Sequence, residues 1–355
     1  MLSNLNALLI TWALTLIIVI GGVTLLELTY DPEEQPADTT TPANVTDGAD
    51  PEAKDAAEGD TSTPQPEVKP ETTADTRAQP RERMAYSTEA LSSQVDPNVI
   101  DIDNMPIIGR NGTKPLNVYA AKHPVGNLRP KITLIMTNVG MNTRLSRDAI
   151  RALPSPVTIA ISPYAIDADR WTDEARMGGH ETLMMLPLEP FDYPRNNPGN
   201  LALLLGSSVS RENTAKLNTI MRKTDRYIGL ISYMGSSFTM NSEAMRPVLT
   251  EIGNRGLMFI DARTVPASRA TQVARGLGVP SSFSNAYVDE NLSEEDIERK
   301  LRALENRART LGYAVGIIRP KPITVRTVNN WLDGAHDRGF ILVPVSATAD
   351  KQPAR

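Results

Sequence analysis

The chain contains 355 residues, of which 40% are hydrophobic and 22% are charged, and it has a net charge of −5, no cysteine and three histidines. This length allows one large domain or two ordinary ones, and the lack of cysteine excludes a disulfide scaffold, a cysteine-ligated metal site and thiol catalysis. Three histidines leave few ways to build a histidine-rich metal centre, and the dispersed Lys and Arg residues exclude a nucleic-acid footprint.

The amino end contains an uncharged apolar run from residue 7 to residue 26. At about 1.5 Å of rise per residue, a helix of this length spans roughly 30 Å, the thickness of the hydrocarbon core of a bilayer. A cleaved signal peptide is the alternative, but residues 1–6 contain no Lys or Arg and no small-residue cleavage site precedes Glu27. We therefore expect an uncleaved transmembrane anchor with a short cytoplasmic end at residues 1–6. The acidic flank that follows the anchor favours an inner-membrane protein with the bulk of the chain in the periplasm.

The next segment, residues 27–83, is acidic and rich in proline and threonine. Residues 31–80 hold 13 acidic residues against three basic ones, together with 8 Pro, 9 Thr and no aromatic residue. Such a segment buries too little apolar surface to offset its conformational entropy, so we expect a disordered, extended linker that holds the folded domain away from the membrane. Residues 84–130 are expected to form an extension that packs on the outside of the domain, with a strand running into a turn at 107–112.

From residue 131 to residue 348, apolar β-branched runs alternate with amphipathic stretches. Strands are expected at 131–139, 157–164, 182–189, 228–234, 257–263, 282–288, 313–319 and 340–346. Helices are expected at 143–152, 167–178, 211–223, 241–254, 266–277, 292–310 and 323–338. Strands that are apolar along their whole length are buried on both faces, which indicates a parallel sheet with helices outside it. We expect an α/β fold of the deformed (β/α)7–8 barrel type, with a tail at 349–355 and with its chemistry at the carboxyl ends of the strands.

Several blocks at these strand ends resemble the divergent polysaccharide deacetylase family. The chain has LPSPVTIAISPYA at 153–165, GHETLMMLPLEPFDYPRNNPG ending at residue 199, MGSSFT at 234–239, DART at 261–264 and LVPVS at 342–346. The blocks occur in the family's order over residues 128–348. The resemblance implies a deformed βα barrel and metal-assisted hydrolysis of an N-acetyl group, in which a divalent ion held by Asp and His lowers the pKa of a bound water.

The chain departs from the family at the positions that hold this metal. The paired Asp-Asp of the family falls on Thr137 and Asn138, one histidine falls on Tyr233 and a second on Arg319. Neutral oxygens and a permanent cation do not offset the desolvation of a divalent ion, so we expect no metal and assign no catalytic residue. Each of the three histidines is expected to be structural. The alternative is an active deacetylase that holds zinc or another divalent metal through an atypical ligand set.

The remaining polar residues at the strand ends are candidates for glycan binding. Glu189, Asp261 and Arg319 are expected to form a polar floor, with the alternative that each acid pairs with a neighbouring arginine. Tyr164 and Tyr233 could give stacking faces for a pyranose ring or could be plain packing. We therefore expect a membrane-anchored envelope protein that binds peptidoglycan or another envelope polysaccharide, or that acts as a scaffold in cell-wall metabolism, with protein partners unknown. The full candidate set is Tyr164, Glu189, Tyr233, Asp261, Arg263 and Arg319.

Overall fold

A computed structural model describes residues 90–124, 126–206 and 210–352 of the chain, which belong to one compact unit. The expected anchor at 7–26 and linker at 27–83 lie outside the described residues. Within the part of the chain that is described, no helix is both long and apolar enough to cross a membrane.

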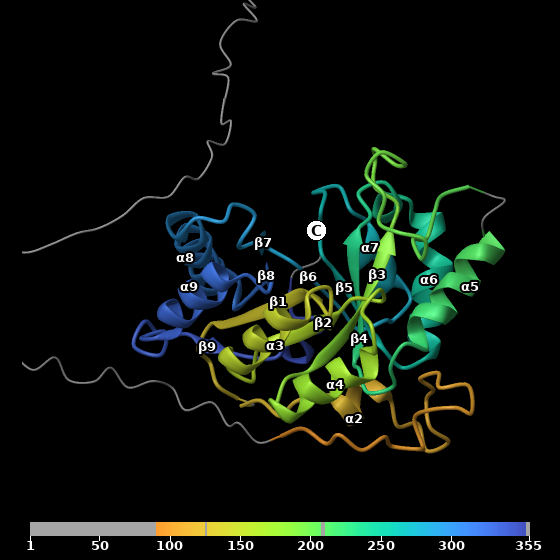
Figure 1. The fold of residues 1–355 in the computed structure, drawn as a ribbon, viewed down its shortest axis with the longest axis horizontal. Coiled ribbons are helices and arrows are strands. Elements are labelled where there is room, and N and C mark those ends of the chain that lie inside the picture. The colour runs from red at the N-terminus through yellow and green to blue at the C-terminus, as the bar shows by residue number, and fades with distance from the viewer. Residues whose placement is uncertain (1–89, 125, 207–209, 353–355) are drawn as a thin grey trace, which may run out of the picture. The chain divides into compact units, whose positions relative to one another are not determined.

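A curled parallel sheet forms the centre of this unit (Figure 1). The path of paired strands runs β6-β5-β4-β3-β2-β1-β8-β7, and β9 pairs with the start of β1. The two ends of the path, β6 and β7, are separated in the chain only by Ser284 and Asn285. The strands are β1 (Lys131–Val139), β2 (Thr158–Ile161), β3 (Thr182–Leu188), β4 (Gly229–Met234), β5 (Met258–Asp261), β6 (Ser281–Phe283), β7 (Ala286–Tyr287), β8 (Tyr313–Ile318) and β9 (Ile341–Leu342).

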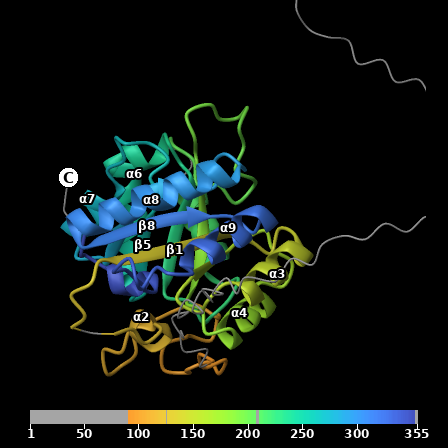
Figure 2. The same ribbon diagram turned by 90° about the vertical axis from the view of Figure 1, so that its left-hand side faces the viewer.

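Helices connect the strands and cover one face of the sheet. Figure 1 shows α5 beside β3, α6 packs against β5, and Figure 2 shows α8 lying along β8. The parallel α/β architecture expected from the sequence is confirmed, but the sheet curls without a continuous ladder from β6 to β7, so it is less closed than the expected barrel. The helices are α2 (Pro115–Tyr119), α3 (Thr143–Ala152), α4 (Ala168–Met177), α5 (Ser210–Met221), α6 (Ser242–Asn254), α7 (Ala270–Gly276), α8 (Glu294–Leu311) and α9 (Pro322–Leu332), with short 3-10 turns η2 (Phe238–Met240) and η3 (Val345–Thr348).

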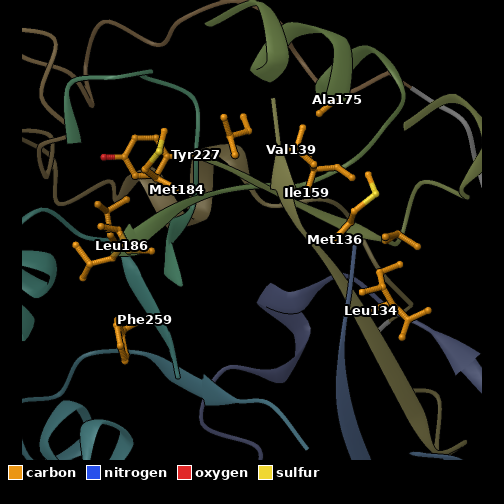
Figure 3. Packing of buried hydrophobic residues seen from close by; sticks show 14 of the residues in the cluster. Leu134, Met136, Val139, Ile159, Ala175, Met184, Leu186, Tyr227 and Phe259 are labelled. Carbon is orange, nitrogen blue, oxygen red and sulfur yellow. The ribbon is translucent and has the colours of Figure 1, made fainter. Parts of the chain in front are cut away.

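The strands β1 to β5 and β8 bury side chains on both of their faces. Leu134, Met136 and Ile159 point toward the helices and join a large outer cluster that contains helix residues such as Ala175 (Figure 3). The residues between them point the other way, because successive side chains of a strand alternate between faces. They form an inner cluster with no residue of α3 to α9, and its strand members are Ile135, Ala160, Leu183, Met185, Ile231, Met258, Ile260, Val315 and Ile317.

The inner cluster is covered at the amino ends of the strands by the segment before β1 and by η3. Tyr119 of α2 and Val345 of η3 are buried members of the inner cluster. Glu181, just before β3, accepts hydrogen bonds from the Ala121 N–H at 2.8 Å and from the Ser346 N–H at 3.1 Å. Both polar and apolar contacts therefore hold this end of the sheet closed, and the opposite end is the one that remains accessible.

The close approach of β4 to β5 gives a prediction about stability. A Cβ added at Gly229 would overlap the carbonyl oxygen of Met258, which belongs to the paired strand. We expect Gly229→Ala to lower the free energy of unfolding by about 1–3 kcal/mol in urea titration, because overpacking displaces backbone. Gly276→Ala is the matched control, since its Cβ meets nothing within 4 Å and a helical alanine stabilises by up to about 1 kcal/mol. Equal stabilities of the two variants would contradict the packing at Gly229.

Glu181 gives a prediction about pH dependence. Burial raises the pKa of this carboxyl to about 7, although the hydrogen bonds from Ser346 and Ala121 act in the opposite direction. The folded state therefore holds the proton more tightly than the unfolded state between about pH 4.5 and 7, so this residue lowers the free energy of unfolding as the pH rises through that range. Relative to Glu181→Gln, we expect the wild type to lose at most about 3 kcal/mol between pH 5 and pH 8 in urea titrations.

The control for Glu181 is the exposed Glu243→Gln variant, measured at the same pH values. A stability difference between Glu181→Gln and the wild type that does not change with pH would mean that the Glu181 carboxyl titrates alike in the folded and unfolded states.

Candidate functional site

The inner face of the sheet becomes polar at the carboxyl ends of the strands. A cavity of about 580 Å³ lies at this end of the sheet. At the ends of four strands, the residue two positions after the last member of the inner cluster lines this cavity, because the alternation of side chains continues past the buried core. A volume of this size lies within the range of roughly 300–1,000 Å³ that is typical of small-molecule sites. The four residues and the cluster members they follow are Ser162 after Ala160, Pro187 after Met185, Tyr233 after Ile231 and Arg319 after Ile317.

The backbone is strained near the carboxyl ends of β1, β4 and β5. Asn138, Met234 and Arg263 adopt left-handed conformations with φ of 61°, 55° and 55°. Such angles disfavour residues other than glycine by roughly 1 kcal/mol or more and are enriched at functional sites. Asn138 lines the cavity, and its backbone N–H donates to Met185 Sδ at 3.1 Å. This irregularity lies one residue before β1 ends at Val139, and Met141 and Asn142 beyond it line the same cavity.

Arg319 is held in place by a buried acid. The Arg319 backbone N–H donates to Asp289 Oδ2 at 2.9 Å, and the Arg319 Nε donates to Oδ1 at 3.3 Å. Nη2 of the same guanidinium donates to the Asp289 carbonyl oxygen. Asp289 is 1% exposed, and the Thr324 hydroxyl also donates to its Oδ2 at 2.9 Å. The pair keeps a guanidinium, 35% exposed, at the wall of the cavity.

Two tyrosines form another part of the lining. The Leu201 N–H donates to Tyr164 Oη at 3.1 Å, and Gly199 lies so close to the Tyr164 ring that a Cβ there would overlap the hydroxyl. Burial raises the pKa of the Tyr164 hydroxyl, so the ring is a neutral donor or acceptor at physiological pH. Tyr233 packs against the inner cluster and is half-buried. The two rings therefore give the cavity an apolar surface with hydroxyl groups at its edges.

Four predicted site residues lie outside the lining of this cavity. The Thr137 hydroxyl donates to the Ile318 carbonyl oxygen at 3.3 Å, and Glu189 Oε2 accepts from the Leu205 N–H at 2.8 Å. Asp261 accepts from the Ser268 hydroxyl at 2.7 Å, and burial raises the pKa of its carboxyl. The Arg263 guanidinium stacks over the Phe283 ring at 4.6 Å. The expected polar floor of Glu189, Asp261 and Arg319 is therefore not assembled here, because each acid is held by a hydrogen bond from the segment that follows its own strand.

The donor set at the cavity does not fit a divalent metal. Asn138 has a neutral carboxamide, the Thr137 hydroxyl faces a backbone carbonyl, and Arg319 has a permanent positive charge. Within residues 90–352 as described, no group of three or more His, Asp or Glu residues could hold a metal ion. His180 is fully buried, with its ring nitrogens 2.7 Å from the Val157 carbonyl and 3.1 Å from the Ile150 carbonyl, and burial lowers its pKa.

Sequence reasoning missed two residues of the site. Asp289 follows the expected strand at 282–288, so the rule that chemistry sits at strand ends would have found it if the rule had been applied to that strand. Lys321 lines the cavity and is the N-cap residue of α9. Its signal was the Arg-Pro-Lys-Pro sequence from 319 to 322, which starts a helix with a proline at its first position.

Comparison with known proteins identifies the relatives of this domain. A model described as "Divergent polysaccharide deacetylase" matches residues 134–349. An uncharacterized protein of Haemophilus influenzae is 30% identical over 196 residues, which are 55% of this chain and 68% of that protein. The Escherichia coli protein YibQ, also uncharacterized, is 26% identical over 211 residues, 59% of this chain and 64% of its own. The chain thus spans about two thirds of each of these relatives.

A solved structure resembles the same domain. The crystal structure of the uncharacterized protein ATU2773 from Agrobacterium tumefaciens has a TM-score of 0.67 and 33% identity, and the match covers 69% of this chain and 99% of that one.

The ion pair between Arg319 and Asp289 gives a prediction about stability. We expect Thr324→Val to lower the free energy of unfolding by about 1.5–3 kcal/mol, because the buried carboxylate loses a hydrogen bond and valine has the same shape as threonine. Thr327→Val is the matched control on the same helix, since its buried hydroxyl donates only to the Ile323 carbonyl of its own helix, and we expect it to cost less than about 1 kcal/mol. Urea titration of both variants is the measurement. Equal costs would mean that the Thr324 bond does not support the pair.

Proposed function

The chain belongs to the divergent polysaccharide deacetylase family, and from this premise we propose that its domain binds a glycan in the cavity at the strand ends without hydrolysing it. The observation that carries the proposal is the position of Arg319. A guanidinium held by a buried Asp289 occupies the wall of the cavity where the resemblance implies a histidine ligand of the metal.

The chemistry of the substituted residues supports a loss of metal-assisted hydrolysis. A divalent ion gives up its hydration shell only when anionic or imidazole ligands replace it. Asn138 and Tyr233 provide neutral oxygens at the cavity, and Arg319 repels a cation. The two acids nearest in sequence to the strand ends, Glu189 and Asp261, already accept hydrogen bonds from Leu205 and Ser268.

The lining of the cavity supports saccharide binding. Asparagine carboxamides and a serine hydroxyl can donate to and accept from sugar hydroxyls, since each has both kinds of atom. Tyr164 and Tyr233 add aromatic surface, which suits the apolar face of a pyranose ring. The polar residues of this kind in the lining are Asn138, Asn142, Asn197, Asn200 and Ser162.

The amino-terminal segment of the chain supports a proposal about where in the cell the domain acts. In this proposal residues 7–26 anchor the protein in the inner membrane, the acidic linker at 27–83 gives reach, and the domain binds peptidoglycan or another envelope polysaccharide in the periplasm. The uncharged run at 7–26 and the proline-rich composition of the linker support this placement.

Binding and hydrolysis can be separated with the full-length protein and oligomers of N-acetylglucosamine. With methyl-labelled methionine, we expect the Met141 and Met185 signals in NMR spectra to shift on titration, because both residues line the cavity. Tyr233→Ala should weaken binding by about tenfold, which corresponds to roughly 1.4 kcal/mol. Tyr313→Ala is the matched control, as a half-buried tyrosine at the amino end of β8, and it should bind normally.

Acetate release and metal content decide the hydrolytic alternative. After incubation with zinc and desalting, the protein should retain no stoichiometric metal by elemental mass spectrometry, and it should release no acetate from the oligomers with or without zinc. Retention of zinc together with acetate release, both lost on Asp261→Ala or Glu189→Ala, would overturn the proposal in favour of an active deacetylase.

A further inference from the structure

The cavity is lined by positive charge without any acid. Arg319 and Lys321 are its charged lining residues, and no Asp or Glu is among the described residues that form its wall. Asp289 balances Arg319 from behind, where it is 1% exposed. No ion pair of Lys321 occurs within the described residues, so its ammonium group leaves a net positive charge at the mouth.

The guanidinium of Arg319 still has a free edge. Its Nε and Nη2 atoms donate to Asp289, and within the described residues no hydrogen bond involves Nη1. An anionic oxygen in the cavity could accept from Nη1 without breaking the pair. Because Asp289 fixes the side chain in advance, ordering this donor costs little further entropy on binding.

Two helices add their positive ends to the same cavity. Asn142, the N-cap of α3, and Lys321, the N-cap of α9, both belong to the lining. Neither helix has an acid in its first turn, whereas the other described helices of ten or more residues (α4, α5, α6 and α8) each have one or more there. An acid in the first turn offsets the helix dipole, so α3 leaves its dipole uncompensated at the cavity, whereas the first turn of α9 meets the buried Asp289 carboxylate through Thr324.

From these charges we infer that the ligand is an acidic saccharide, a sugar that carries a carboxylate or a phosphate group, with the anionic group bound by Lys321 and Arg319. The inference rests on the proposed glycan binding and names the class of glycan. The tyrosines and asparagines contact the ring and its hydroxyls, and the cationic side of the cavity selects the charged substituent.

Matched pairs of sugars test this selection. The full-length protein with methyl-labelled methionine is titrated with N-acetylmuramic acid against N-acetylglucosamine, with glucuronic acid against glucose, and with glucose 6-phosphate against glucose. At low ionic strength, the shifts of Met141 and Met185 should give at least about fivefold tighter binding for the acidic member of one or more pairs. The preference should shrink in high salt. The pair with the largest ratio tells whether the anionic group is a carboxylate or a phosphate.

A matched pair of lysines tests the assignment. Lys321→Gln should reduce the acidic-over-neutral ratio by about two- to threefold, and Lys321→Glu should remove it. Lys114 is the control, since it too is an N-cap residue followed by proline, at the start of α2. Lys114→Gln should keep the wild-type ratio.

The possible failures are distinguishable. Equal binding of acidic and neutral sugars with loss on Tyr233→Ala would overturn this inference and leave the proposed function standing. A preference for acidic sugars that survives Lys321→Glu would also overturn it. No shift of Met141 or Met185 with any sugar would overturn both the inference and the proposed glycan binding.

Discussion

The constraint on which this structure depends is the burial of its strands on both faces. In β1 and β3 every Leu, Ile, Met and Val side chain packs either against the helices or into the inner cluster, so a charged side chain in the middle of these strands would suffer large desolvation. Polar chemistry is therefore confined to the two ends of the sheet. One end is occupied by α2 and η3, which are fastened through Glu181, and the cavity forms at the other. The location of the site follows from the burial pattern before any particular residue is considered.

At that open end, one buried acid organises the charge. Asp289 accepts from the backbone and side chain of Arg319 and from Thr324, so three groups satisfy a carboxylate that water hardly reaches. A buried carboxylate without such partners would be strongly destabilising, and a buried pair is costly to break even where it adds little net stability. The arrangement fixes where the guanidinium points more than it stabilises the fold. It makes Arg319 a rigid part of the wall of the cavity.

The sequence predicted much of this arrangement, because periodicity and capping act locally. β1 and α3 have the expected bounds, since an apolar run and an asparagine N-cap define them without help from elsewhere. The expected strand at 282–288 is divided into β6 and β7, because its first half pairs with β5 and its second half with β8. The helix expected at 323–338 ends at residue 332, before Gly334 with its positive φ of 84°. The division of the strand arises from partners distant in the chain, which a local pattern does not contain, whereas Gly334 is a local signal for the end of the helix.

The difference between what a local pattern contains and what the rest of the fold adds also explains which site residues could be predicted. Tyr233 and Arg319 could be found from the alternation of strand residues, which carries them onto the inner face beyond the core. Glu189 and Asp261 were expected there too, but Asp261 follows the inner-cluster residue Ile260 by one position and so faces away from the cavity, where it accepts from Ser268. Glu189 lies in the loop after β3, where its carboxylate accepts from the Leu205 N–H. A metal-dependent hydrolase needs negative charge at this mouth to hold a cation. Here the accessible charge is positive, and the acid that balances part of it is buried behind the wall of the cavity. A molecule that enters the cavity therefore meets a positive potential, the reverse of the potential that would hold a metal ion.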